Sequence, residues 1–215
     1  MKKQLIWAIA SCAVTLGAHA GEIYGGAGLP GVMLGYAHTA SERLVLRADL
    51  STIGSVSRDR SESGIDYTGT AKLNRAGLFA DWFPGSGGFR LTGGVTFNDM
   101  KIDLAGHGNG GTITIGGNSY VTSADDRFNA RIKFPSATPY VGIGWGHHAA
   151  GPGWGFVFDL GGSIGRAKVE GSVSGPNLSG NVSQADIDAE LTQLRDGVGK
   201  VRFVPQVSIG ASYRF

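Results

Sequence analysis

Apolar and polar residues alternate along much of this chain. In the last twelve residues, VPQVSIGASYRF (residues 204–215), every second residue counted back from Phe215 is apolar, and the intervening ones are polar or small apart from Val204. Successive side chains of a β-strand point to opposite faces. The tail therefore predicts one strand with an apolar face and a polar face.

The same alternation recurs upstream at the frequency expected of a sheet. It is found in residues 43–51, 75–82, 89–98, 139–146 and 154–164. Residues 22–38 form one further strand, or two if the chain turns at Leu29-Pro30-Gly31. Because single-chain bacterial barrels have an even number of strands, we favour two strands here and eight in all. Changes of phase near Asn74 and Asp99 indicate bulges.

The aromatic residues of the apolar face indicate which solvent that face meets. They cluster near the ends of the segments and comprise Trp82, Phe89, Trp145, Trp154, Tyr213 and Phe215. Aromatic girdles at the two bilayer interfaces have this placement, and segments of about ten residues fit a tilted membrane crossing. The prediction is an all-β fold, a transmembrane antiparallel up-and-down β-barrel.

Short and long connections alternate along the chain. Residues 39–42, 85–88 and 147–152 are short, and residues 57–68, 106–127 and 171–200 are long. Outer-membrane barrels have short periplasmic turns and long outer loops, which would place Phe215 in the periplasm. Residues 112–121 predict a small hairpin. Residues 183–194 predict a helix capped by Ser183 and Asp186, which either packs over the barrel mouth or binds a partner.

The first twenty residues have the features of a secretory signal peptide. A basic start (Met1 to Gln4) is followed by an apolar run (Leu5 to Gly17) and the small-residue motif Ala18-His19-Ala20. We therefore expect a signal peptide at residues 1–20 and a barrel domain at residues 21–215. A lipoprotein signal with lipidated Cys12 is the alternative.

Removal of that signal peptide changes the chemistry available to the chain. Cys12 is the single cysteine, so no disulfide, thiol nucleophile or thiolate metal site would remain. Loss of Lys2 and Lys3 leaves 17 basic residues against 17 acidic ones, a formal charge of zero. This balance argues against a nucleic-acid partner, which needs a basic stripe. No motif indicates a cofactor.

Four stretches carry a resemblance to a known family: IYGGAGLPGVMLGYAH, PYVGIGWG, GWGFVFDLG and VPQVSIGASYRF. With the signal peptide, they resemble the CarO-type and OmpW-like small barrels of bacterial outer membranes. The resemblance implies contact with outer-membrane lipid and assembly by the barrel assembly machinery, which reads Tyr213 and Phe215 in the last strand. It also implies a porin for ornithine and other basic amino acids. The shared motifs are structural, and no substrate-binding residue is carried over.

The polar face of the strands would place charged side chains in the barrel lumen. They are Arg47, Asp49, Arg75, Asp81, Arg90, Asp159, Arg202 and Arg214. Because eight strands leave an interior barely wide enough for side chains, these groups could form a salt-bridged plug. Alternatively, lumen glycines leave a narrow pathway in which Asp49, Asp81 and Asp159 attract cationic solutes.

Three classes of function follow from these features. A narrow porin for passive passage of small polar solutes is the primary prediction, and a non-conducting barrel with a structural or surface-interaction role is the alternative. A lipid-modifying barrel enzyme is a minor alternative, because His38, His107, His147 and His148 belong to no catalytic motif. Two adjacent histidines are also a weak metal signal, so neither catalysis nor a metal site is expected.

Overall fold

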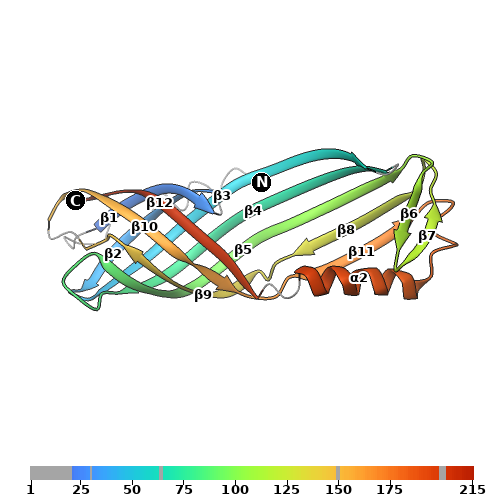
Figure 1. Cartoon of the computed structure of the whole chain (residues 1–215). Coiled ribbons are helices and arrows are strands. Elements are labelled where there is room, and N and C mark those ends of the chain that lie inside the picture. Colours follow the sequence, from blue (N-terminus) through green and yellow to red (C-terminus); the bar gives the residue numbers. More distant parts are fainter. Residues whose placement is uncertain (1–20, 30, 63–64, 149–150, 199–201) are drawn as a thin grey trace, which may run out of the picture.

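Eight antiparallel strands form a closed barrel in the computed structural model (Figure 1). The structure describes residues 21–29, 31–62, 65–148, 151–198 and 202–215, so the predicted signal peptide lies outside the described residues. The barrel strands are β1 (Gly21–Leu29), β2 (Gly31–Ser41), β3 (Leu44–Glu62), β4 (Ile65–Trp82), β5 (Phe89–Gly108), β9 (Ala137–Trp145), β10 (Gly153–Ile164) and β12 (Phe203–Arg214). Pairing of β1 with β12 and of β5 with β9 completes the ring. The prediction of eight strands, with two strands from residues 22–38, is confirmed.

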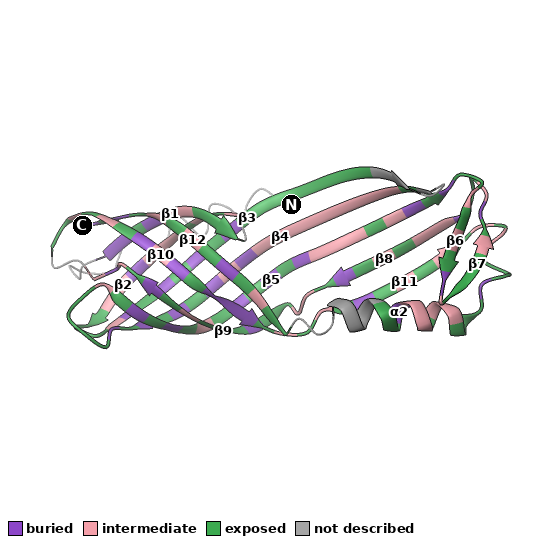
Figure 2. Ribbon diagram, in the orientation of Figure 1, coloured by how far each residue is buried: buried purple, intermediate pink, exposed green. Residues whose placement is uncertain are grey.

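Burial along the barrel strands is inverted relative to a soluble protein. Large apolar side chains lie on the outside, with Leu34 65% and Ile209 57% exposed, whereas Arg90 and Asp81 point inward and are fully buried. Exposed residues accordingly alternate with buried or intermediate ones along β12 and the barrel part of β5 (Figure 2). This is the pattern of a barrel whose outer face meets lipid.

The six predicted interface aromatics are on the outer surface but form a single girdle. Trp82 and Trp145 lie at the ends of strands, and Phe89 and Trp154 at the beginnings, where they adjoin the short connections. Tyr213 of β12 lies directly opposite Trp154 and is therefore at the same end. Phe215, whose backbone N–H donates to the Gly21 carbonyl at 3.2 Å, lies at the same end. The prediction of two girdles from this set was therefore wrong. We call this end of the barrel the turn end and the opposite end the loop end.

Exposed phenylalanines mark the loop end of the lipid-facing surface. Phe97 is 49% exposed and is the last β5 residue paired with β9, and Phe203, 45% exposed, begins β12. Neither residue is among the six aromatics that the sequence pattern placed at an interface. Together they mark where the second membrane boundary is expected.

Three barrel strands continue far past the loop end. β3, β4 and β5 are 19, 18 and 20 residues long, and β8 (Arg127–Lys133) and β11 (Lys168–Ser174) extend the same sheet beyond β5. Residues 57–68, predicted as a loop, thus belong largely to paired strands, although residues 63–64 lie outside the description. We call this sheet, with the elements packed on it, the extension (Figure 1).

The phase changes of the sequence have two different structural causes. The pairing of β3 with β4 shifts register between Thr52, which lies opposite Asn74, and Gly54. The bulge predicted near Asn74 is therefore present. At Asp99, in contrast, β4 and β5 stay in register. β5 instead changes its other partner from β9, paired up to Phe97, to β8, paired from Lys101. The bulge predicted at Asp99 is therefore absent from the β4–β5 ladder.

A hairpin and a helix cover the inward face of the extension. The predicted hairpin is present as β6 (Thr112–Ile115) and β7 (Asn118–Val121), with Gly116 and Gly117 at positive φ in the turn. α2 (Gln184–Val198) begins after Ser183, whose Oγ accepts from the Asp186 N–H at 3.1 Å. Leu191 of α2 packs with Ile132 and Val169. The helix thus lies along the extension and not over the barrel mouth.

Among the described residues, no helix combines the length and hydrophobicity needed to cross a membrane, a finding that concerns helices alone.

Deletion of Phe215 is expected to impair assembly into membranes strongly. The residue directly follows β12, the strand that closes the barrel on β1, and its backbone N–H donates to the Gly21 carbonyl. It therefore secures the end of a ring that leaves no free edge. The measurement is the yield of heat-modifiable folded protein in cell envelopes. Ser57→Ala, in the exposed part of β3, serves as the control and should fold like the wild type. Equal yields from the two variants would contradict the expectation.

Candidate functional site

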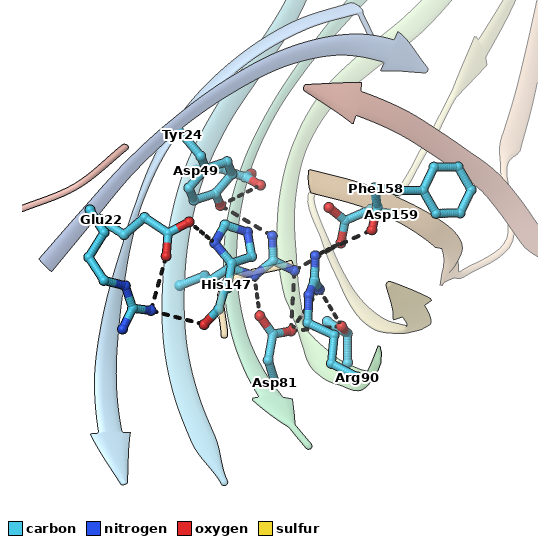
Figure 3. Close-up of polar contacts among 11 residues, drawn as sticks. Glu22, Tyr24, Asp49, Asp81, Arg90, His147, Phe158 and Asp159 are labelled. Carbon is cyan, nitrogen blue, oxygen red and sulfur yellow. Dashed lines mark hydrogen bonds and ion pairs between the residues drawn. The ribbon is translucent and has the colours of Figure 1, made fainter. Parts of the chain in front are cut away.

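The barrel interior contains a network of oppositely charged side chains (Figure 3). Four arginines and four carboxylates of the barrel strands are at most 8% exposed: Arg47, Arg75, Arg90, Arg214, Glu22, Asp49, Asp81 and Asp159. Their formal charges cancel. Buried charges are tolerated when they are paired and hydrogen-bonded in this way.

Two arginines share two aspartates at the centre of the network. Arg47 donates through Nη2 to Asp81 Oδ1 at 3.2 Å and to Asp159 Oδ1 at 3.1 Å, and its Nε also donates to Asp81. Arg90 Nη1 lies 3.1 Å from Asp81 Oδ1, and its Nη2 lies 2.9 Å from Asp159 Oδ1. Each aspartate therefore links the same two guanidinium groups. These four residues, from β3, β4, β5 and β10, are called the charged quartet below.

A second pair extends the network toward the loop end. Arg75 Nη2 lies 2.7 Å from Asp49 Oδ1, while its Nη1 donates to Gln206. The Tyr24 hydroxyl donates to Asp49 Oδ2 at 3.2 Å. Beyond this pair, Gln206 Nε2 donates to Ser163 Oγ at 2.9 Å. The polar contacts thus connect strands on opposite sides of the barrel.

Neutral polar side chains complete the interior near the loop end. Thr96 Oγ1 lies 2.8 Å from Ser163 Oγ and 2.7 Å from Thr138 Oγ1. Asn98 Nδ2 donates to Thr138 Oγ1 at 2.9 Å. Polar contacts therefore occupy the lumen from one end of the barrel to the other.

At the turn end, the network includes two residues that the sequence analysis did not assign to the lumen. Glu22 accepts at Oε1 from His147 Nδ1, 2.8 Å away, and at Oε2 from Arg214 Nη2, 3.2 Å away. Arg214 also donates to the His147 carbonyl at 3.1 Å. His147 has a positive φ of 63°, which turns the chain back into the barrel after β9. A histidine expected in a solvated turn is instead 3% exposed.

The lumen glycines make room for large side chains, not for an open pathway. A Cβ at Gly144 would lie 2.6 Å from Arg90 Cζ, and one at Gly35 would lie 2.3 Å from Tyr24 Cζ. The cavity left between Arg47, Arg75 and Tyr140 measures about 20 Å³. Since a single water needs roughly 10–15 Å³ by this measure, the cavity has room for about one water molecule.

Seven of the eight charges predicted for the lumen are buried there. They are Arg47, Asp49, Arg75, Asp81, Arg90, Asp159 and Arg214. Arg202 is exposed, and the prediction for it was wrong. It has the parity of an inward residue, but it precedes β12, where the closed wall of the barrel has ended.

The described histidines occupy separate places and make separate contacts. His147 pairs with Glu22, whereas the ring of His148 stacks on Phe83 at a centroid distance of 4.8 Å. His107 lies on β5 in the extension, opposite Asp66 and Arg127. Within the described part of the chain, no group of three or more His, Cys, Asp or Glu residues is arranged to hold a metal ion.

Ionic and polar contacts also fix the elements of the extension. Asp186 of α2 accepts from Ser183 Oγ at 2.6 Å, Tyr120 Oη at 2.6 Å and Asn118 Nδ2 at 2.8 Å. These hydrogen bonds hold the pKa of the Asp186 carboxyl below its ordinary value, and the bond from Ser183 makes the largest contribution. The carboxylate thereby ties the helix to the β6–β7 hairpin.

Together, the closed ring, the lipid-facing apolar surface and the polar interior define an outer-membrane β-barrel. The solved structures identify the particular type. The fold is similar to that of Acinetobacter baumannii CarO, with a TM-score of 0.58 and 17% identity over 92% of this chain and 98% of that chain. It is equally similar to A. baumannii CarO2, with a TM-score of 0.58 and 16% identity over 92% and 99% of the two chains. The chain thus has the CarO-type barrel fold, which fits the bacterial outer membrane.

No protein-family model and no curated protein sequence matches the chain.

Proposed function

We propose that this protein is a closed outer-membrane barrel that holds the extension rigidly outside the membrane, where its surface makes contacts. The observation that carries the proposal is the filled lumen, whose central cavity of about 20 Å³ is far smaller than any amino acid. Short turns on the periplasmic side would direct the extension to the cell exterior. The role requires no catalytic group.

Opening the lumen would require separating several buried ion pairs at once. Arg47 alone contacts Asp81, Asp159 and the face of Phe79, whose ring centroid lies 5.1 Å from its guanidinium carbon. Removal of one charge leaves its partner buried and unpaired, which costs about 3–5 kcal/mol in proteins. We therefore propose a resting state in which the lumen is closed to the free passage of water and ions.

The construction of the extension supports a role in display. Asp186 joins α2 to the hairpin, and Asp126 Oδ1 accepts from the backbone N–H groups of Asn177 and Leu178 at 3.0 and 3.2 Å. Leu178 is fully buried in a cluster with Ile115. Loops that only needed to stay soluble would not require such contacts. The extension stands beyond the barrel mouth, as expected of a surface that meets a partner (Figure 1).

Electrical silence of the folded protein in planar bilayers is the expected result. The refolded chain of residues 21–215 is inserted and its current recorded under a salt gradient. A known open barrel inserted in the same bilayers shows that small conductance steps would be detected. Discrete steps from the wild-type protein at low voltage would overturn the closed-barrel proposal.

Gated passage of small polar solutes is the second candidate function. It is favoured by the continuity of polar side chains from Glu22 at the turn end to Asn98 at the loop end. If the ion pairs separate transiently, the lining would be polar throughout its length. Passage of basic amino acids in particular stays a prediction.

Swelling of loaded liposomes distinguishes the two candidates. A gated cation pathway would be supported if lysine and ornithine entered faster than glutamate and if Asp159→Asn slowed their entry. Asp99→Asn, which removes an exposed carboxylate from the extension, is the matched control. Equal exclusion of all three solutes by both variants and the wild type would leave display as the supported function.

A further inference from the structure

The lysines of this chain are concentrated in one row of the extension. Of seven lysines, Lys2 and Lys3 belong to the predicted signal peptide and Lys200 lies outside the described residues. The other four are in register on neighbouring strands, and form the lysine row: Lys72 of β4, Lys101 of β5, Lys133 of β8 and Lys168 of β11. Residues directly opposite one another in a sheet point to the same face. The row therefore projects four cations from one side.

The row faces outward, on the side continuous with the lipid-facing wall. On β5, Lys101 has the same parity as the exposed Phe97. The neighbouring position on each of β5, β8 and β11 faces the opposite way, where Ile102, Ile132 and Val169 pack with α2. The lysine side chains cannot enter this core, so they remain on the outer surface.

The height of the row matches the headgroup region of a membrane. Lys101 lies four positions beyond Phe97, which is at the loop end of the lipid-facing surface. At about 3.3 Å per residue and a strand tilt of about 40°, the row lies roughly 10 Å beyond Phe97 along the barrel axis. Flexible lysine side chains can also reach back toward the interface.

Three carboxylates on this face, Asp99, Asp103 and Glu170, do not neutralise the row, because Arg131 of the same face interacts with both Asp103 and Glu170. Lys72 Nζ lies 2.5 Å from Asp99 Oδ2, and Lys101 Nζ lies 3.6 Å from Asp103 Oδ2, an aspartate that Arg131 also binds. Lys133 and Lys168, directly opposite each other, form no ion pair with any residue that the structure describes. Like charges in this position destabilise a sheet unless a counter-ion is supplied.

The lysine row and the barrel interior contain different basic residues. All four buried cations of the lumen are arginines, whose planar groups hold fixed ion pairs. The row contains only lysines, which act as flexible, hydrated point charges suited to phosphate. We propose that the lysine row binds the phosphate groups of lipid A, the phosphorylated glycolipid headgroup of the outer leaflet. Phosphate oxygens would then supply the counter-charge that Lys133 and Lys168 lack.

The test measures binding of fluorescent lipid A, carrying both phosphates, to the folded chain of residues 21–215 in neutral detergent micelles at low salt. A basic residue near an anionic lipid surface is worth about fivefold in affinity, so Lys133→Gln with Lys168→Gln should weaken binding about 25-fold. The matched control is Arg43→Gln with Arg58→Gln, two exposed cations at the turn end and farther along β3. It should bind like the wild type.

Three results would overturn the proposal. The lysine and arginine double variants could bind equally, lipid A stripped of phosphate could bind the wild type as tightly as the phosphorylated form, or inorganic phosphate at the same concentration could displace the lipid. Heat-modifiable migration of both variants establishes that they are folded. Neither lysine belongs to the lumen network, so the outcome is independent of whether the barrel conducts.

Discussion

Replacement of Asp81 by alanine is expected to lower the free energy of unfolding by about 3–5 kcal/mol. The carboxylate is fully buried and accepts from Arg47, from Arg90 and from Thr92 Oγ1, the last at 2.7 Å. Its removal leaves two buried guanidinium groups to share Asp159. Urea titration of the refolded protein in lipid vesicles, followed by tryptophan fluorescence, measures the change.

Asp99→Ala is the matched control for this prediction. Asp99 also pairs with a cation, but the side chains of Lys72 and Asp99 are 38% and 59% exposed. Exposed pairs contribute about 0–1 kcal/mol, so the urea midpoint should barely move. Similar shifts for Asp81→Ala and Asp99→Ala would show that the buried network does not stabilise the barrel.

Replacement of the whole charged quartet by serine is expected to convert a silent barrel into a conducting one. Arg47, Asp81, Arg90 and Asp159 carry two charges of each sign, so the fourfold variant keeps the net charge. Because an eight-stranded barrel is closed by its own side chains, shortening four of them at one level should admit water and small ions. Planar-bilayer recording should show discrete steps that the wild type lacks.

An equivalent set of charges on the outside provides the control. Lys72, Asp99, Asp103 and Arg131 also comprise two cations and two carboxylates in exposed ion pairs. Their replacement by serine should leave the bilayer current unchanged. If the quartet variant folds and remains silent, the closure must be assigned to the aromatic side chains Tyr24, Phe79 and Tyr140 instead.

The barrel was predictable because lipid and lumen impose opposite demands on alternate residues. In β12, apolar residues such as Ile209 face outward and polar ones such as Gln206 face inward, so a period of two is written into the sequence. The extension lacks this contrast at Ser57 and Thr70, whose hydroxyl groups pair across two exposed strands. Because water can reach the polar groups of both strands, apolar and polar residues did not need to alternate there. The sequence of this segment therefore resembled that of a loop.

The errors at the site also have physical causes. Side-chain parity assigned Arg202 to the lumen, but parity carries no information about where the wall of the barrel ends. His147 follows the last residue of β9 by two positions, and its positive φ returns it to the interior. Glu22 is the second residue of β1, a glycine-rich strand with weak alternation. The aromatic girdle, in contrast, could have been placed correctly, since consecutive antiparallel strands meet at the same end.

The continuity of β3, β4 and β5 from barrel to extension determines how the protein would respond to a mechanical load. Because β4 and β5 stay in register from Ile65 to Trp82, with no bulge between barrel and extension, a pull on the far end is transmitted directly into the wall. Such a load runs along the strands and shears many ladder hydrogen bonds together, for example the whole β4–β5 register from Ile65 to Trp82. A protein tethered through the far end of the extension would resist tension with all of these hydrogen bonds at once, and the load would pass through the barrel to the surrounding membrane.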